Sequence, residues 1–303
     1  MKRKVIQIAD STQLVSLPRK WALKHGIKKG QELEVIEDGK KLTVMPPGNQ
    51  NPVKKTELNV GELKELMRRA MGVLYKSGYD EIVVRYPKPE LVQTIQQCLQ
   101  DELIGYEIIE QYPTHCVIKA VATGSDTEFD VVLRRTYLLL KSMLEGVVGV
   151  MDSGDKKALP GLRFLEKSNN KYTGYCRRII NKFGLPNVGL PAIYYCLVEE
   201  IEKIADEAKY LCDYLQKVNG KLNPAVTSIF KDVLKLYNQT YDLHYSFDLN
   251  KLESLFAAKT ALVLNARKIQ AEAKIKHSES MHFVINLTQL FSNLWSFEFA
   301  LNL

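Results

Sequence analysis

The sequence predicts a multidomain α+β protein whose 303 residues fall into three successive segments. Short runs of alternating apolar and polar residues occupy the first segment, as in half-buried strands. The second segment mixes strand-like and helical periods, and the third keeps a helical period to its end. We expect a small β-rich domain, a small α/β domain and an all-α domain, over residues 1–48, 56–123 and 125–303 respectively.

The first domain is expected to hold short strands around a helix of about two turns. Pro18 suits the first position of that helix, Gly26 its C-terminal left-handed position and Gly30 a turn. Asp38-Gly39 is typical of a type I′ hairpin turn. Fewer than about 50 residues of short strands bury too little apolar surface to fold securely alone, so we expect association through this domain. The strand-like runs are residues 3–9, 14–17, 31–36 and 42–45.

A linker rich in Pro, Gly and Asn precedes the second domain. In that domain Asn59, followed three residues later by Glu62, predicts the start of a helix. The pattern then predicts a strand, a second helix and a hairpin, over residues 81–86, 89–103 and 106–122.

The third domain is expected to be an antiparallel bundle of two three-helix units in series. Ser125 and Glu128 form a capping box at its start. Six helices of roughly 20–30 residues follow, separated by Pro, Gly, Asn and Ser positions. The third of them carries an apolar seam with helical spacing. The seam residues are Ile193, Leu197, Ile201, Ile204, Ala208, Leu211 and Leu215.

The positive charge is concentrated at the N-terminus. Residues 1–55 hold 12 Lys and Arg side chains against 5 Asp and Glu, an excess of +7, and the other 248 residues hold 30 of each sign. Such asymmetry indicates a surface for an anionic partner.

Composition excludes several other classes. The five cysteines are an odd number without a Cys-x-x-Cys pair, so neither a disulfide framework nor a zinc ribbon is indicated. The first ten residues lack the apolar run of a signal peptide, and residues 281–297 are too short and too polar to span a membrane. We expect a cytoplasmic protein without membrane insertion.

The first segment resembles the SpoVT/AbrB-type swapped-hairpin DNA-binding domain. The stretch VSLPRKWALKHGIKKGQELEV followed by a hairpin has that family's pattern. The resemblance implies a swapped-hairpin β-barrel formed by a homodimer. The matching positions are Val15, Leu17, Pro18, Gly26, Ile27 and Gly30.

The helical segment resembles PhoU proteins, which regulate phosphate uptake. The resemblance rests on the stretch IEKIADEA at residues 201–208 and on the order of the domains. The segments ELIGYEIIEQ and EFDVVLRRTYLLLKSM look like the connecting part of archaeal proteins that fuse these two domains. The resemblance implies a PhoU-like pair of three-helix bundles and a role in phosphate homeostasis.

Basic side chains of the first domain are the candidate DNA contacts, because Lys and Arg neutralise phosphates and release counterions. The alternative is that exposed lysines only keep a small domain soluble. Family members carry an Arg before the strand and an Arg pair in the helix, where this chain has Gln13-Leu14 and Ala22-Leu23. This favours backbone attachment over base readout, or a domain used only for dimerisation. The candidates are Lys2, Arg3, Lys4, Arg19, Lys20 and Lys24.

Three carboxylates, Glu199, Glu202 and Asp206, share one face of the third long helix, opposite the seam, and are expected to project outward. Oxygen ligands suit a divalent metal or iron, and PhoU proteins bind metal clusters through such motifs. The alternative is a solvated acidic face balanced by Lys203 and Lys209. In the corresponding stretch of the last helix, residues 293–300, Asn293 and Phe297 stand where the carboxylates of a second copy of the motif would be expected.

No nucleophile with a nearby base and no phosphate-binding loop is visible, so an enzyme is not expected. The sequence favours a dimeric DNA-binding regulator of phosphate uptake whose helical domain senses or relays phosphate status. The alternative is an adaptor for a phosphate transporter or a sensor kinase, in which the first domain only dimerises.

Overall fold

The computed structural model describes residues 2–8, 12–38, 40–46, 53–61, 64–122, 126–185, 190–272 and 274–302. The chain divides into two compact units, Met1–Pro52 and Val53–Leu303. The linker expected between the first two domains falls at this division, and most of its residues lie outside the described ranges.

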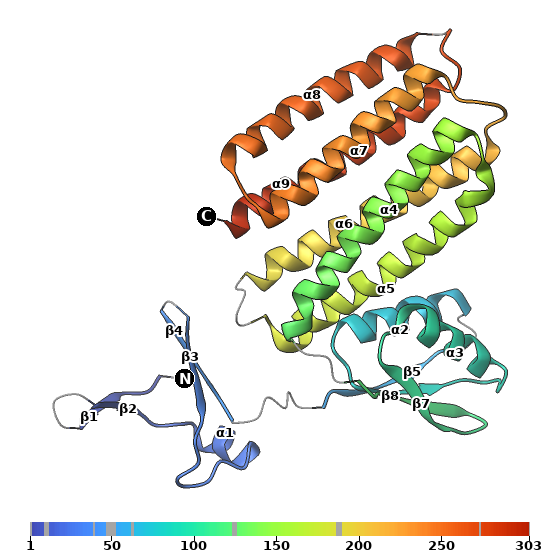
Figure 1. The fold of residues 1–303 in the computed structure, drawn as a ribbon. Coiled ribbons are helices and arrows are strands. Elements are labelled where there is room, and N and C mark those ends of the chain that lie inside the picture. Colours follow the sequence, from blue (N-terminus) through green and yellow to red (C-terminus); the bar gives the residue numbers. More distant parts are fainter. Residues whose placement is uncertain are drawn as a thin grey trace. The chain divides into compact units, whose positions relative to one another are not determined.

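The first unit contains two separate antiparallel hairpins and one short helix (Figure 1). The first hairpin pairs Val5 with Val15, and the second pairs Glu34 with Met45. Gly26 and Gly30 have positive φ angles of 62° and 82°, as expected for a helix end and a turn. Gly39 of the expected hairpin turn lies outside the described residues. The elements are β1 (Val5–Ile8), β2 (Thr12–Val15), α1 (Arg19–Lys24), β3 (Glu34–Asp38) and β4 (Lys41–Met45).

The first unit has no buried core of its own among the described residues. Apolar side chains of β1 and β2 that would ordinarily build one are between 44% and 59% exposed. Ile6 and Leu14 are cross-strand partners, so they lie on the same face of the first hairpin. The unit therefore presents an apolar surface that a single copy leaves uncovered.

A four-stranded sheet opens the second unit, with strand order β5-β6-β8-β7. Strand β5 runs parallel to β6, and the other neighbours are antiparallel. Helices α2 and α3 cover the face of the sheet that is turned toward α5 (Figure 1). The bounds are β5 (Lys55–Asn59), α2 (Lys64–Lys76), β6 (Glu81–Arg85), α3 (Leu91–Glu102), β7 (Tyr106–Gln111) and β8 (His115–Ala120).

The start of this sheet corrects the sequence analysis. Asn59 does not begin a helix: it ends β5, and its Oδ1 accepts a hydrogen bond from the Gly61 amide at 3.1 Å. Helix α2 begins at Lys64, and Glu62 lies outside the described residues. The short polar strand escaped prediction because its exposed positions carry Lys, Glu and Asn, which are poor strand formers.

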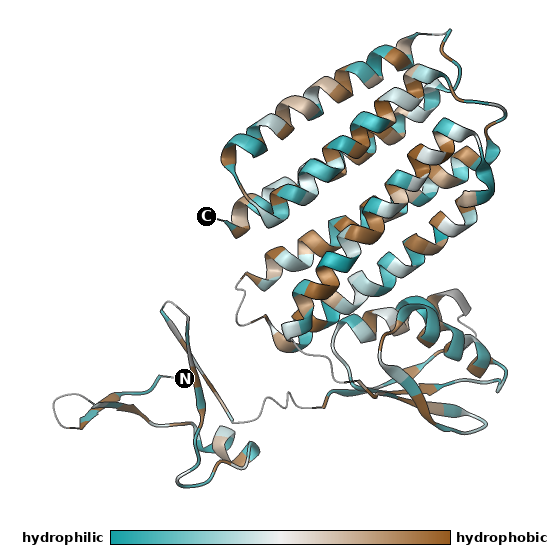
Figure 2. Cartoon of the chain, viewed as in Figure 1, coloured by the Kyte–Doolittle hydropathy of each residue, from teal (hydrophilic) through white to brown (hydrophobic). Residues whose placement is uncertain are grey.

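Long helices make up the rest of the second unit, and their breaks fall where the sequence predicts them. Helices α4, α5 and α6 pack against one another, as do α7, α8 and α9, and the two groups meet along α6–α9 and α4–α7. Apolar and polar stretches recur along each of these helices (Figure 2). The bounds are α4 (Phe129–Ser153), α5 (Leu159–Phe183), α6 (Pro191–Lys217), α7 (Pro224–Tyr245), α8 (Leu249–Ala271) and α9 (Met281–Leu301).

One continuous apolar core joins both groups of helices. The predicted seam of α6 is part of it: Leu197, Ile201, Ile204 and Leu211 are fully buried. Trp295 is also buried and donates a hydrogen bond from Nε1 to Thr240 Oγ1 at 2.9 Å. Among the described residues, no helix combines the length and the apolar character that crossing a bilayer requires.

Candidate nucleic-acid interface and carboxylate stripe

The six candidate DNA-binding residues all belong to the first unit, and all are exposed. Lys2, Arg3 and Lys4 precede β1, whereas Arg19, Lys20 and Lys24 lie on α1. None of the ion pairs formed within the described ranges involves any of these six side chains. Their charges are therefore uncompensated within the described part of the unit.

The ends of helix α1 and the spacing of its lysines determine where its basic side chains lie. Pro18 lies just before the helix with φ −62°, and Gly26 follows its end in the left-handed region. Lys20 and Lys24 are four residues apart and share a face. The rings of Trp21 and His25 lie side by side, with centroids 5.1 Å apart and planes tilted by 45°, and both side chains are partly buried.

The carboxylate stripe of α6 is engaged by a buried arginine. Arg177 of α5 has a side chain only 4% exposed, and it forms ion pairs with both Glu199 and Glu202. Thr173 Oγ1 adds a hydrogen bond to Glu202 Oε2 at 2.9 Å. The expectation that all three carboxylates project into solvent is wrong for Glu202, because α5 packs against this side of α6.

The third member of the stripe, Asp206, belongs to a second cluster. Lys209 forms ion pairs with Asp206 and, at 3.1 Å, with Glu166 of α5. Burial raises the pKa of the Glu166 carboxyl above its ordinary value, although the hydrogen bond from Lys209 acts in the opposite direction. Asn170 Nδ2 also donates to Glu166, at 2.7 Å.

These contacts do not fit a metal centre. The guanidinium of Arg177 and the ammonium of Lys209 already hold the carboxylates that a cation would need. Within the ranges that the structure describes, no group of three or more His, Cys, Asp or Glu side chains is arranged to hold a metal ion. The sequence analysis predicted a metal site on this stripe. Metal analysis of the purified protein, compared with a Glu202→Ala plus Asp206→Ala variant, tests that prediction directly.

Arg178 is a buried contact residue that the sequence analysis missed. Its guanidinium pairs with Asp80 at 2.8 Å and donates to the carbonyl oxygens of Tyr75 and Tyr79 at 3.1 and 2.8 Å. It also lies over the rings of Tyr75 and Tyr106, 5.2 and 4.9 Å from their centroids. These contacts fasten the α/β layer to α5. The signal in the sequence was an arginine next to the apolar residues Cys176, Ile179 and Ile180 of α5.

Comparison with known families bears on the first unit. Residues 6–51 match the family described as "Antidote-toxin recognition MazE, bacterial antitoxin". The match covers β1 to β4 and α1, so the first unit has a MazE/AbrB-type domain. Neither the curated proteins nor the solved structures gave a match. A PhoU relationship of the helical region has no support from these comparisons.

Proposed function

We propose that the protein is a dimeric DNA-binding regulator in which two copies of the first unit form the DNA-binding module. The observation that carries the proposal is a set of exposed, uncompensated basic side chains on a MazE/AbrB-type unit. The second unit then serves as the part that receives a signal.

Dimerisation follows from the missing core of the first unit. Val5, Ile6, Ile8, Leu14 and Val15 are all more than two-fifths exposed in a single copy. Burying apolar surface contributes about 25 cal/mol per Å², and a second copy offers the same apolar faces in complementary positions. A paired unit also doubles the basic set and places the two copies in symmetric register, as two DNA half-sites require.

The chemistry of the basic residues favours attachment to the phosphate backbone. Four of the six candidates are lysines, and the other two are Arg3 and Arg19. Lysine ammonium groups act as point charges on phosphates, whereas base readout relies on the planar donors of Arg, Asn and Gln. Binding with modest sequence preference and a steep dependence on salt is expected.

A retardation assay at about 50 and 200 mM salt tests the proposal. Arg19→Ala plus Lys20→Ala should weaken binding strongly at both concentrations. Arg267→Ala plus Lys268→Ala is the matched control, because it removes an adjacent, exposed Arg-Lys pair from α8 in the second unit. Absence of DNA binding by the unaltered protein at the lower salt would refute the proposal.

We further propose that the regulated process is phosphate uptake. The support is the resemblance of residues 201–208 to PhoU proteins, together with the order of the domains. Mapping the genomic DNA bound in cells at low and at high phosphate tests it, and occupancy should change at phosphate-uptake genes. Identical maps under the two conditions would contradict a phosphate role while leaving DNA binding intact.

An adaptor role is the second candidate, and the departures from the AbrB pattern favour it. Ala22-Leu23 stand where family members carry an arginine pair, which is compatible with a domain that only dimerises. Co-purification with a phosphate transporter or a sensor kinase, in complexes free of DNA, would support the adaptor and count against the regulator.

A further inference from the structure

Helix α8 lies at an edge of the helical part of the second unit and leaves one of its faces uncovered (Figure 1). The opposite face packs against α7 and α9. The buried residues of that face are Leu252, Leu255, Leu262, Ala266 and Ile269. We call the row of exposed side chains on the uncovered face the outer stripe. Its members are Leu249, Glu253, Phe256, Thr260, Leu264, Arg267 and Ala271.

The outer stripe has the spacing of a helix face that packs against another helix. Its members follow one another at steps of three or four residues, so they lie within about 80° of the helix circumference. Leu249, Phe256 and Leu264 are 56%, 48% and 61% exposed. Single apolar side chains are ordinary on a protein surface, whereas a row of them with helical spacing indicates a contact face.

The outer stripe is symmetrical about Thr260. Phe256 and Leu264 stand four residues before and after it, and Glu253 and Arg267 stand seven residues before and after it. Two copies of α8 that run antiparallel across a two-fold axis at Thr260 therefore place Phe256 level with the partner's Leu264. The same arrangement places Glu253 level with the partner's Arg267. The stripe is thus complementary to itself.

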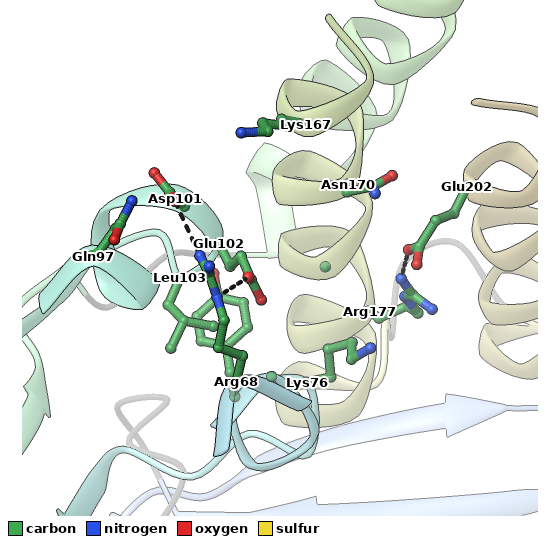
Figure 3. A pocket seen from close by; sticks show the side chains of 13 residues that line it. Arg68, Lys76, Gln97, Asp101, Glu102, Leu103, Lys167, Asn170, Arg177 and Glu202 are labelled. Carbon is green, nitrogen blue, oxygen red and sulfur yellow. Dashed lines mark hydrogen bonds and ion pairs between the residues drawn. The ribbon is translucent and has the colours of Figure 1, made fainter. Parts of the chain in front are cut away.

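The two charges of the outer stripe favour the antiparallel arrangement. Neither Glu253 nor Arg267 forms an ion pair with any described residue. Figure 3 shows the contrasting case of Arg68, which is paired with Asp101 and Glu102 at 3.0 Å each. An antiparallel pair of α8 helices gives Glu253 and Arg267 their partners at both ends. A parallel pair would set like charges against each other.

The middle of the outer stripe suits the close approach of a second helix. Thr260 is small, and its Oγ1 donates a hydrogen bond to the carbonyl oxygen of Phe256 at 3.0 Å. Covering Thr260 therefore leaves no unpaired hydroxyl donor. The ring of Phe256 meets the ring of Trp295 edge to face, with centroids 5.0 Å apart. Because this contact already orders Phe256, pairing costs little further side-chain entropy.

We propose that the outer stripe is an interface between two copies of this chain, paired antiparallel across a two-fold axis at Thr260. Seven side chains from each copy are fewer than the roughly 20–30 residues a side of a standard interface, so the pairing is weak. At low protein concentration the stripe stays unpaired, and association there depends on the first unit. At high concentration, or where dimers lie side by side, the stripe joins two dimers into a tetramer.

The inference goes beyond DNA binding and does not depend on it. The outer stripe belongs to the second unit, whereas the candidate DNA contacts belong to the first. Substitutions in the stripe should therefore leave the binding of a single dimer to DNA unchanged.

Sedimentation equilibrium of the full chain without DNA tests the interface. Between about 5 and 500 µM, the mean mass should rise toward twice its value at low concentration. Glu253→Arg and Arg267→Glu should each weaken this association roughly tenfold, because two-fold symmetry makes one substitution alter two charge pairs. Arg135→Glu is the matched control, since it reverses an exposed arginine of α4, and it should have no effect.

The exchange of the two charges tests the pairing itself. Glu253→Arg combined with Arg267→Glu restores opposite charges across the interface, so it should return the association constant to within about threefold of the original. The proposal is overturned if the mass does not rise at up to about 500 µM. It is also overturned if the single reversals have no effect, or if the combined exchange does not recover the association that they lose. Circular dichroism confirms that each variant is folded.

A cysteine placed on the two-fold axis tests the register of the two helices. The background is Cys196→Ser, which removes the exposed cysteine among those that the structure describes. Thr260→Cys should form a disulfide between copies under mild oxidation at high protein concentration, because residues on the axis come closest. Asn265→Cys is the matched control on an exposed position of α8 outside the stripe. Equal cross-linking of the two variants would overturn the proposed register.

Discussion

At the scale of single residues, Arg178 joins the α/β layer to the helices through five separate contacts. It satisfies two backbone carbonyl oxygens and one carboxylate while its flat face covers two tyrosine rings. Arginine suits this position because it combines a rigid fork of donors with a weakly hydrated plane. A lysine could reproduce neither the number of bonds nor the stacking.

Removing this side chain should be costly. Arg178→Ala is expected to lower the free energy of unfolding by about 3–5 kcal/mol, since it leaves buried acceptors and part of the Asp80 charge without a partner. Arg163→Ala is the control: Arg163 and Asp213 form a 3.1 Å pair at the surface, worth about 0–1 kcal/mol. Urea denaturation measures both, and equal losses in the two variants would contradict the role assigned to Arg178.

Glu166 gives a prediction about pH. Because its pKa is raised in the folded state, the folded protein keeps this proton at pH values where the unfolded chain has lost it. The contribution of Glu166 to stability therefore falls as the pH rises above about 4.3.

Glu166→Gln should remove that dependence. We expect the stability of the variant, measured relative to the unaltered protein, to increase between about pH 4 and pH 7. Urea denaturation at several pH values measures this difference, and Glu145→Gln on the exposed face of α4 serves as the control. A relative stability that decreased over the same range would contradict the assignment.

At the scale of elements, α8 shows how a single side chain defines a helix start. Asp248 accepts hydrogen bonds from the amides of Asn250 and Lys251, at 2.8 and 3.0 Å. Asp248→Ala should therefore lower the free energy of unfolding by about 1 kcal/mol. Thermal denaturation midpoints of both variants test this, with Asp232→Ala as the control because it changes an exposed carboxylate within α7. Equal midpoints for the two variants would show that the cap is unimportant.

Elements with strong periodicity could be predicted from the sequence, and short polar ones could not. The seam of α6 and the breaks between the long helices follow from apolar spacing and from Pro, Gly and Asn, which act locally. Strand β5 carries only a weak local signal, because its order depends on parallel pairing with β6, some 25 residues away.

The carboxylate stripe of α6 also shows how far prediction from the local sequence can go. Helical spacing correctly placed Glu199, Glu202 and Asp206 on one helix, but no local pattern could reveal that Arg177 of α5 would meet two of them. Partners on another element depend on tertiary packing. The basic excess of the first unit does not depend on contacts with another element. It could therefore be found by counting charged residues in the sequence.

At the scale of the whole molecule, association should depend on the first unit. A chain that begins at Val53 is expected to keep its helical circular dichroism, because the large core lies entirely in the second unit. It should be monomeric by light scattering where the full chain is dimeric. Ile6→Asp in the full chain should have the same effect, since it places a charge on the apolar face shared with Leu14. A dimer that survived both changes would place the interface elsewhere.

The uncovered hairpins of the first unit make the protein responsive to its own abundance. If only paired copies can hold DNA, the amount of competent species at low expression rises with the square of the number of chains, as mass action requires for any dimer. Doubling synthesis would then raise operator occupancy about fourfold while occupancy is low. The first unit, which has no buried core of its own among the described residues, would thus make DNA occupancy rise more steeply than the protein level.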